Sequence, residues 1–185
     1  MSLELGISLV CPVYRSAQTL RILVDEICTC LNGTHKFEIL LIDDRSPDSS
    51  WLEILQISKE NSTVRGIRLG RNVGQHGALL AGIRSARFDK IVTIDDDLQN
   101  PPSEVIKLVQ ALDSNGGVVY GVSTDVKQKW WRKASSTGAK QLFKKFLSFD
   151  SAVKISSFRA FETNLRNAFS GEIGPSVSID SLLTW

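Results

Sequence analysis

Residues 90–102 read KIVTIDDDLQNPP, an apolar run that ends in three consecutive carboxylates, Asp95, Asp96 and Asp97. A short apolar run that stops at polar residues is typical of a buried strand. Three adjacent carboxylates repel one another, so a cation or surrounding water has to offset their charge. The stretch therefore predicts a strand with a polar site at its carboxyl end.

The same arrangement, an apolar run followed by polar residues, occurs earlier in the chain before the segments CPVYR and DDRSPDSS. The strands predicted from apolar runs are residues 6–10, 37–42, 64–69, 91–94 and 117–122. The helices predicted from hydrophobic spacing are residues 20–31, 51–59, 78–86 and 103–112. Ser50 and Glu53 have the spacing of a capping box at the start of the second helix.

Strands that are apolar throughout and alternate with helices indicate a parallel sheet covered by helices on both faces. We therefore expect an α/β fold with an open, mostly parallel sheet. The small residues of the helix at 78–86 would let it lie close to that sheet. In such sheets ligands bind beyond the carboxyl ends of the strands. The three polar strand ends are thus expected to converge on one crevice.

The overall composition is that of a single globular domain over residues 1–185, with 42% hydrophobic and 23% charged residues. A net charge of +2 gives no indication of a nucleic-acid partner. The three cysteines and two histidines lack the spacing of a zinc site, which favours a reducing cytoplasm. No apolar run has the length of a membrane span. Because the chain stops abruptly after an apolar segment, we expect it to be truncated at its C-terminus.

Residues 126–149 differ from the rest of the chain because they contain no acidic residue. Basic and aromatic residues alternate there, which predicts a basic aromatic helical segment. Such a segment suits an anionic membrane surface. A solvated basic face over an apolar core stripe is an equal alternative.

The aspartates after the fourth predicted strand have the chemistry of a cation site. Asp95, Asp97 and the amide oxygen of Gln99 are hard oxygen donors, and Mg²⁺ commonly takes one or two carboxylates with substrate phosphates and water. The alternative is a solvated loop or a helix N-cap before Pro101. Both interpretations remain open on these residues alone.

Two other polar segments have the chemistry of a nucleotide site. Asp43 and Asp44 are able to accept hydrogen bonds from a base or a ribose, or to start a turn into the next helix, and each residue can do one of these. Arg71 and Asn72 lie in a glycine-punctuated loop, where a guanidinium and backbone N–H groups suit phosphate oxygens.

Taken together, four segments carry a resemblance: ISLVCPVYRSAQTL, EILLIDDRSPDSS, RLGRNVGQHGALLAGI and IVTIDDDLQNPPSEV. In this order they resemble the GT-A glycosyltransferases of family 2, and within that family they are most similar to the polyprenyl-phosphate branch. That branch includes dolichyl-phosphate mannose synthase and the undecaprenyl-phosphate aminoarabinose transferases. The resemblance covers about the first two thirds of the chain well. It implies a GT-A fold and an inverting transfer of sugar from a nucleotide-diphospho-sugar donor.

The resemblance also implies which residues form the donor site. The nucleotide contacts that it implies are Pro12, Tyr14, Asp43, Asp44, Arg71, Asn72 and Asp95. The ligands that it implies for Mg²⁺ or Mn²⁺ are Asp95, Asp97 and Gln99. Asp96 stands where these enzymes usually have Ala, so we expect it to face away from the cation.

On the acceptor side, the resemblance implies that Arg132 and Ser136 bind the phosphate of a polyprenyl phosphate, and that the segment SSFRAF carries Arg159. Together with Asp97, Arg132 and Ser136 are the expected catalytic residues. The branch usually has another arginine where this chain has Ser123. We expect a cytoplasmic protein, with the cytosolic face of a membrane as a further possibility.

Two other functions stay open. A soluble family 2 transferase would add the sugar to a saccharide hydroxyl, and its general base would come from Glu162, Glu172 or Asp180. A lipid phosphate needs no base because it is already ionised. A function of another class is a nucleotide-sugar-binding module without turnover.

Overall fold

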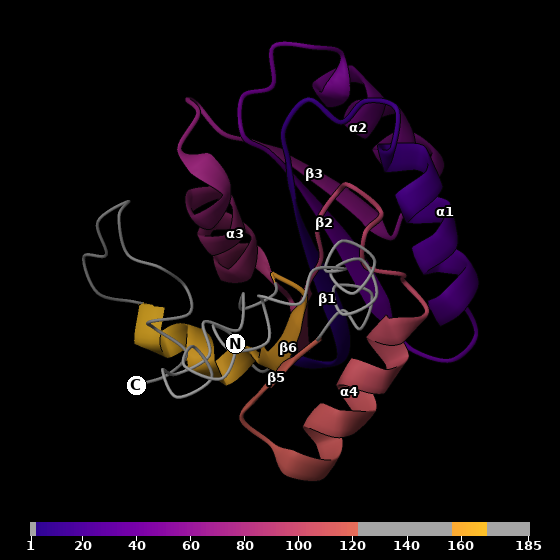
Figure 1. Cartoon of the computed structure of the whole chain (residues 1–185), viewed down its shortest axis with the longest axis vertical. Coiled ribbons are helices and arrows are strands. Elements are labelled where there is room, and N and C mark those ends of the chain that lie inside the picture. The colour runs from indigo at the N-terminus through magenta and orange to yellow at the C-terminus, as the bar shows by residue number, and fades with distance from the viewer. Residues whose placement is uncertain (1–2, 122–156, 170–185) are drawn as a thin grey trace, which may run out of the picture. The chain divides into compact units, whose positions relative to one another are not determined.

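The computed structural model describes residues 3–121 and 157–169, which form a sheet with helices on both of its faces (Figure 1). The strands are β1 (Glu4–Val13), β2 (Phe37–Asp43), β3 (Val64–Arg68), β4 (Phe88–Thr93), β5 (Val118–Tyr120) and β6 (Arg159–Glu162). The helices are α1 (Leu20–Leu31), α2 (Ser50–Glu60), α3 (Gly74–Ser85), α4 (Glu104–Asn115) and the 3-10 helix η1 (Thr163–Phe169).

The strand order in the sheet is β3-β2-β1-β4-β6-β5. β1 pairs in parallel with β2 and β4, and β2 pairs in parallel with β3. β6 is antiparallel to both of its neighbours, β4 and β5. The prediction of an α/β fold with a mostly parallel sheet is therefore confirmed. The sequence patterns did not predict β6, which has only four residues.

Alternate residues of the strands bury their side chains on opposite faces of the sheet. On one face Leu9 and Ile39 belong to the core that α1, α2 and α4 cover. On the other face Val10 and Leu40 pack with residues of α3. Because both faces are covered, apolar residues occupy both faces of the central strands, as the sequence pattern indicated.

α3 lies close to the sheet because it has a glycine where it crosses β1 and β2. A Cβ atom added at Gly82 would lie 2.3 Å from Val10 Cγ1 and 3.1 Å from Ile42 Cγ1. The prediction of a small-residue helix close to the sheet is thus confirmed. Its start was predicted too late, since α3 begins at Gly74 and includes residues that had been placed in a loop.

The predicted capping box at the start of α2 is wrong. Helix α2 begins at Ser50, and Ser49 occupies the N-cap position without a side-chain hydrogen bond. The Ser50 hydroxyl instead donates to Asp48 Oδ1 at 2.7 Å and accepts the Ser16 N–H at 2.9 Å. The Glu53 carboxylate pairs with Arg21 at 3.0 Å. Both side chains therefore have partners other than the helix end.

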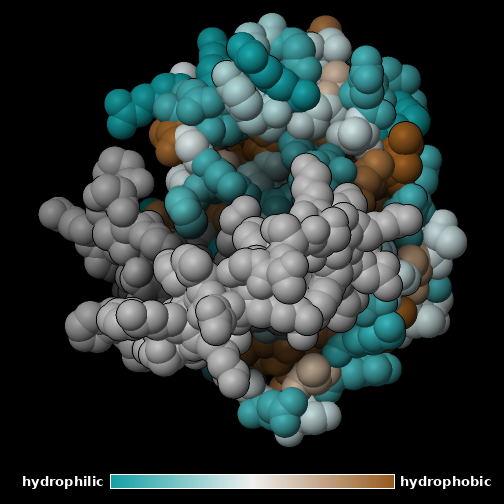
Figure 2. Space-filling view, in the orientation of Figure 1, coloured by the Kyte–Doolittle hydropathy of each residue, from teal (hydrophilic) through white to brown (hydrophobic). Residues whose placement is uncertain are grey.

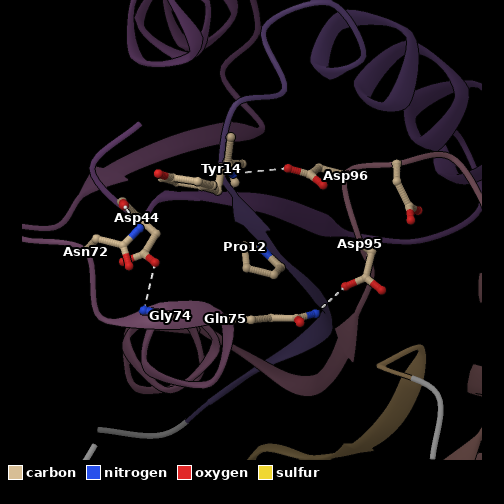
Figure 3. Close-up of a pocket in the computed structure, with 10 residues that line it drawn as sticks. Pro12, Tyr14, Asp44, Asn72, Gly74, Gln75, Asp95 and Asp96 are labelled. Atoms are coloured by element: carbon tan, nitrogen blue, oxygen red, sulfur yellow. Dashed lines mark hydrogen bonds between the residues drawn. The ribbon is translucent and has the colours of Figure 1, made fainter. Parts of the chain in front are cut away.

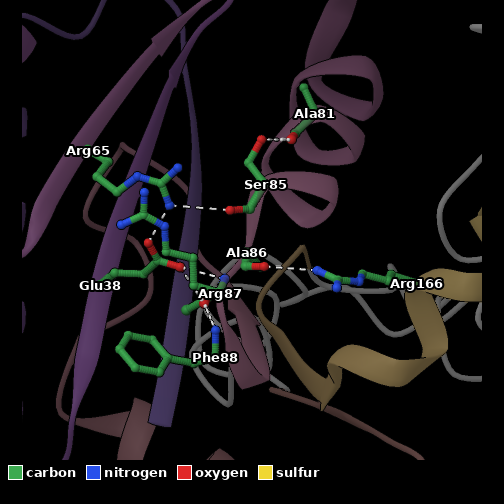
Figure 4. A network of polar contacts seen from close by, with 9 residues as sticks. Glu38, Arg65, Ala81, Ser85, Ala86, Arg87, Phe88 and Arg166 are labelled. Carbon is green, nitrogen blue, oxygen red and sulfur yellow. Dashed lines mark hydrogen bonds and ion pairs between the residues drawn. The ribbon is translucent and has the colours of Figure 1, made fainter. Parts of the chain in front are cut away.

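A polar network around Glu38 joins the sheet to α3 at the amino ends of the parallel strands (Figure 4). Glu38 is 4% exposed. Its Oε2 accepts from Arg65 Nη1 at 2.6 Å, and its Oε1 accepts from the Ser8 hydroxyl and the Arg87 N–H, each at 2.8 Å. The same Arg65 nitrogen donates to the Ser85 carbonyl at 3.3 Å. This buried charge is therefore fully paired.

The chain divides into two units, residues 1–121 with 157–185 and residues 122–156. The predicted basic aromatic segment at 126–149 falls in the second unit, outside the described residues. Within the described part, no helix is both long enough and apolar enough to cross a membrane. In the space-filling view, hydrophilic residues cover most of the upper part of the molecule, with scattered hydrophobic ones between them (Figure 2). Ile22 of α1 and Leu52 of α2 are among the exposed large hydrophobic residues.

Candidate active site

A cleft of about 440 Å³ opens at the carboxyl ends of β1, β2 and β4. Its lining residues are Pro12, Val13, Tyr14, Asp44, Asn72, Gly74, Gln75, Asp95, Asp96 and Asp97 (Figure 3). The strand order reverses between β1 and β4, because β2 and β3 lie on one side of β1 and β4 lies on the other. Ligands of open α/β sheets bind at this kind of switch point. The cleft also has the size of small-molecule sites.

Most of the expected donor-site residues meet in this cleft. The expected residues that line it are Pro12, Tyr14, Asp44, Asn72, Asp95 and Asp97. Asp43, Arg71 and Gln99 are not among its lining residues. Arg132 and Ser136 lie outside the described residues. The convergence of the three polar strand ends was therefore predicted correctly.

The adjacent aspartates at the end of β2 have different surroundings. Asp43 is fully buried, its Oδ1 accepts the Ser46 N–H at 3.0 Å, and its Oδ2 pairs with Arg68 Nε at 3.0 Å. Asp44 faces the cleft, and its two carboxylate oxygens accept the N–H groups of Val73 and Gly74 at 2.7 and 2.8 Å. Asp44 thus satisfies two of the free backbone donors at the start of α3. Asp43 holds the loop after β2 through Ser46.

Each of the three cleft loops that follow β1, β2 and β4 contains a non-glycine residue in the left-handed region. Arg15 follows β1 with φ 59°, Arg45 follows β2 with φ 59°, and Leu98 follows β4 with φ 60°. Such residues cost on the order of 1–3 kcal/mol each and persist only where the surroundings hold them. Their occurrence in all three loops indicates that tertiary contacts fix the shape of the cleft.

Asp95 is held by partners on α3 and next to β6. Gln75 Nε2 donates to its Oδ1 at 2.8 Å (Figure 3), and the Ser157 hydroxyl donates to its Oδ2. Burial raises the pKa of Asp95, and the charge of Asp97 adds to the rise, while the two hydrogen bonds and the charge of Arg159 oppose it. A neighbouring positive charge would therefore favour the ionised carboxylate.

Asp96 lines the same cleft but has its own partners, on the loop after β1. Its Oδ2 accepts the Tyr14 N–H at 3.2 Å and the Ser16 hydroxyl. Burial raises the pKa of Asp96, and the charge of Asp95 adds to the rise, while the hydrogen bonds oppose it. In Figure 3 its carboxylate points toward Tyr14, whereas that of Asp95 points toward Gln75. That Asp96 faces away from a bound cation stays a prediction.

The carboxylates of the cleft suit a cation that is shared with a phosphate group. Asp97 is exposed, and its Oδ1 accepts the Gln99 N–H at 3.0 Å. No group of three or more His, Cys, Asp or Glu side chains in the described part is arranged to hold a metal by itself. Mg²⁺ commonly uses only one or two carboxylates and completes its shell with substrate phosphates and water. Asp95 and Asp97 fit that mode of binding.

The negative field of these carboxylates reaches the neighbouring strand. Burial raises the pKa of the Cys11 thiol well above its usual range, and the charges of Asp96, Asp95 and Asp97 raise it further. Cys11 lies at the end of β1, directly below the cleft residue Pro12. The thiol is therefore neutral.

Residues 8–168 match the family model described as glycosyl transferase family 2. The chain belongs to this family. Its structure resembles mannosyltransferase PcManGT from Pyrobaculum calidifontis in complex with GDP-Man and Mn²⁺, with a TM-score of 0.69 and 17% identity over 98% of this chain and 51% of the other. It also resembles S. aureus TarS in complex with UDP, with a TM-score of 0.65 and 15% identity over 97% of this chain and 53% of TarS.

A third similar structure is glucosyl-3-phosphoglycerate synthase from Mycobacterium tuberculosis in complex with Mn²⁺, UDP and phosphoglyceric acid. Its TM-score is 0.61, with 19% identity over 88% of this chain and 57% of the synthase. These likenesses confirm the GT-A fold. The family 2 chain described here spans about half the length of these solved structures.

Sequence reasoning missed several polar contacts of this family 2 site. Gln75 was placed in a loop, although it lies in the first turn of α3 and bonds Asp95. Ser16 and Ser157 gave no signal, because each is a single serine whose aspartate partner is 80 or 62 residues away in the chain. The available signal for a turn into α3 was the glycine itself, since Gly74 has φ 81°, a conformation that glycine adopts readily.

Two residues that the sequence placed on the acceptor side, Glu162 and Arg159, belong to β6. Of the three candidates for a general base, Glu162 does not fit: it lies opposite Lys90 in the antiparallel register of β4 and β6, in the amino-terminal half of β4, whereas the cleft lies at the carboxyl end. Arg159 is 1% exposed and lies within the sheet, in register with Thr93 and Tyr120. Glu172 and Asp180 lie outside the described residues.

Proposed function

We propose that this chain is the catalytic domain of a glycosyltransferase that takes a sugar from a nucleotide-diphospho-sugar donor and transfers it with inversion. The observation that carries this proposal is the cleft at the switch point between β1 and β4, in which Tyr14, Asp44 and Asp97 face one space. An aromatic ring, a hydrogen-bond acceptor and a cation ligand are what a base, a ribose and a diphosphate require. Family membership supports the same reaction class.

In this proposal, Pro12 and Tyr14 contact the nucleotide base, and Asp44 with Asn72 lies beside the ribose and diphosphate. Asn72 Nδ2 donates to the Asp44 carbonyl at 3.1 Å, so the two residues form one side of the cleft. Asp43 does not line the cleft and contributes indirectly, because its buried carboxylate holds the loop that carries Asp44. Arg71 is exposed beside the cleft, where its guanidinium is free to approach a phosphate.

We propose that Asp95 and Asp97 hold Mg²⁺ or Mn²⁺ together with the donor diphosphate, and that Gln99 supports Asp97. When bound, the cation offsets the charge that develops on the departing nucleoside diphosphate. The complexes of PcManGT and the mycobacterial synthase contain Mn²⁺, which supports a divalent cation here. Asp95, fixed by Gln75 and Ser157, keeps its carboxylate oriented at the cleft.

The acceptor that we favour is a polyprenyl phosphate at the cytosolic face of a membrane. Its support is the resemblance of the motifs to the polyprenyl-phosphate branch, with Arg132 and Ser136 as the phosphate contacts and residues 126–149 as the membrane-facing segment. A saccharide or other hydroxyl acceptor is the alternative. The synthase complex contains phosphoglyceric acid, a molecule that carries a hydroxyl group, so the test includes a hydroxyl acceptor.

The test measures release of nucleoside diphosphate from a panel of GDP- and UDP-sugars, with Mn²⁺ or EDTA, and with a short polyprenyl phosphate, an oligosaccharide or no acceptor. Release that requires Mn²⁺ and the polyprenyl phosphate supports the favoured function. Release that requires the oligosaccharide supports the alternative. Metal-dependent binding of donor without turnover on any acceptor would indicate a nucleotide-sugar-binding module, and absence of both would contradict the proposal.

Arg132→Ala separates the two sides of the proposed site. It is expected to lower the rate with polyprenyl phosphate while leaving the dissociation constant of the nucleoside diphosphate unchanged, because its proposed partner is the acceptor phosphate. Lys140→Ala, in the same basic segment, is the matched control for loss of one positive charge. Equal loss of donor binding and acceptor use in Arg132→Ala would assign this arginine to the donor instead.

A further inference from the structure

The carboxylate of Asp96 bridges the switch point of the sheet. Asp96 follows β4, while both of its partners, the Tyr14 N–H at 3.2 Å and the Ser16 hydroxyl, follow β1. The Ser16 hydroxyl also lies 3.1 Å from the Tyr14 carbonyl, so Asp96, Tyr14 and Ser16 are all in contact with one another. The contact therefore connects the two strands between which the cleft opens.

The loop after β1 is held from its other side as well. The Arg15 N–H donates to the Ser46 hydroxyl at 3.2 Å, and the Ser16 N–H donates to the Ser50 hydroxyl at 2.9 Å. Arg15 between these contacts has φ 59°, a conformation that side-chain-bearing residues rarely adopt. The loop at 14–16 is therefore clamped between Asp96 on the cleft side and the loop before α2.

We propose that Asp96 is a positioning residue of the donor site: it fixes the loop at 14–16, and through it Tyr14, and it does not ligate the cation. This inference rests on the proposed function, because it assumes that Tyr14 contacts the nucleotide. Tyr14 lines the cleft and is 46% exposed. Asp96 holds its backbone, while its ring contacts the Arg15 guanidinium, 5.4 Å from the ring centroid, and remains accessible to a ligand. Loss of the Asp96 contact would free the loop on the side where the ligand binds.

The geometry distinguishes Asp96 from its two neighbours. Asp95 is turned to Gln75 and Ser157, and Asp97 accepts within its own loop from Gln99. Asp96, in contrast, accepts from the Tyr14 N–H and the Ser16 hydroxyl, which both belong to the loop after β1. The middle carboxylate of the triple aspartate thus makes a contact from the end of β4 to the loop after β1.

The experiment compares Asp96→Ala, Asp96→Asn, Ser16→Ala and the double variant Asp96→Ala with Ser16→Ala. The probes are UDP and GDP, titrated by calorimetry at saturating Mn²⁺ and at graded Mn²⁺ concentrations. Asp25→Ala, which removes an exposed aspartate of α1, is the control for loss of one negative charge.

Asp96→Ala is expected to weaken nucleoside diphosphate binding about tenfold, since it removes hydrogen bonds to a charged acceptor. The Mn²⁺ concentration for half-maximal binding should remain that of the wild type. Ser16→Ala should weaken binding in the same direction, and the double variant should be no weaker than Asp96→Ala alone. Asp96→Asn, which retains an acceptor oxygen, should recover part of the affinity.

A second measurement, hydrogen exchange, tests how firmly the loop is held in the absence of any ligand. Hydrogen exchange of the segment around residues 13–19 should be faster in Asp96→Ala than in the wild type and in Asp25→Ala. In a turnover assay, Asp96→Ala should raise KM for the donor and leave kcat near the wild-type value. A raised KM with an unchanged kcat is expected when the lost contact helps to bind the donor and takes no part in the chemical step.

Three results would overturn the inference. These are a raised Mn²⁺ requirement in Asp96→Ala, additive losses in the double variant, or unchanged affinity together with unchanged hydrogen exchange. Failure of the wild-type chain to bind any nucleoside diphosphate would instead contradict the proposed function. In that case faster exchange in Asp96→Ala would still confirm that Asp96 holds the loop, and unchanged exchange would contradict that claim too.

Discussion

Asp44 is the residue through which β2 and α3 form one side of the cleft. Its carboxylate accepts two backbone N–H groups at the start of α3, from Val73 and Gly74, and it is 4% exposed. A carboxylate at a helix start is favourable both as a hydrogen-bond acceptor and for the helix dipole. The same side chain therefore contributes to stability and to the shape of the ligand site.

We expect Asp44→Asn to lower the free energy of unfolding by about 1–2 kcal/mol, because an amide has only one acceptor oxygen for two N–H donors. Urea unfolding followed by circular dichroism measures the loss. Asp25→Asn on the exposed face of α1 is the matched control and should remain close to the wild type. Equal stability of Asp44→Asn and the wild type would show that this cap contributes nothing.

At the scale of elements, the position of α3 depends on its contact with β1 and β2. A side chain at Gly82 would enter the space of Val10 and Ile42, which are both buried. The start of the helix, which carries Gln75 to the cleft, is set by how closely the remainder of α3 lies on the sheet.

Gly82→Ala is therefore expected to destabilise the fold by about 1–3 kcal/mol through overpacking. This cost should exceed the helix-propensity gain of about 1 kcal/mol that Ala has over Gly. The measurement is again urea unfolding, with Gly70→Ala as control, because a Cβ at Gly70 has no atom within 4 Å. A stabilised Gly82→Ala variant would mean that α3 moves away from the sheet without cost.

The elements that sequence predicted well are those whose signal is local. The buried strands β1, β2 and β4 are apolar runs that end in polar residues, and these features are visible in any short window. The start of α3 and the cap of α2 were misjudged because distant residues, Asp44 and Ser16, provide the hydrogen bonds there. β6 was missed because its four residues pair with β4, about 70 positions earlier in the chain.

For the candidate site too, the sequence predicted the features that are local and missed those that depend on distant residues. The aspartates of the cleft follow directly from the sequence, because each lies just after a predicted strand. Their orientations do not, since Gln75, Ser16 and Ser157 come from other elements and become neighbours only in the fold. The sequence pattern therefore predicts which chemical groups line the cleft, and tertiary contacts decide which donor each carboxylate binds.

At the scale of the whole described unit, the two ends of the sheet have different roles. The carboxyl ends of the parallel strands carry the cleft, and the amino ends carry the paired charge of Glu38 with Arg65. Burial of Glu38 makes its pairing important for stability, because a lost partner leaves a buried charge uncompensated. The network lies away from every residue that lines the cleft.

Glu38→Gln should thus lower the free energy of unfolding by about 3 kcal/mol, since it removes one partner of a buried ion pair. The affinity for a nucleoside diphosphate in the folded protein should stay that of the wild type. Chemical denaturation and calorimetric titration of the same preparation measure both quantities. Reduced affinity at full folding would show that the two ends of the sheet are coupled.

The central claim is that the cleft binds a nucleoside diphosphate through a divalent cation held by Asp95 and Asp97. Calorimetric titration of UDP and GDP into the wild-type chain and Asp97→Asn, each with Mn²⁺ and with EDTA, tests it most directly. We predict binding of at least one nucleotide to the wild type with Mn²⁺, and loss of that binding in EDTA and in Asp97→Asn. Equal affinity with Mn²⁺ and EDTA, or in the wild type and Asp97→Asn, would contradict the claim.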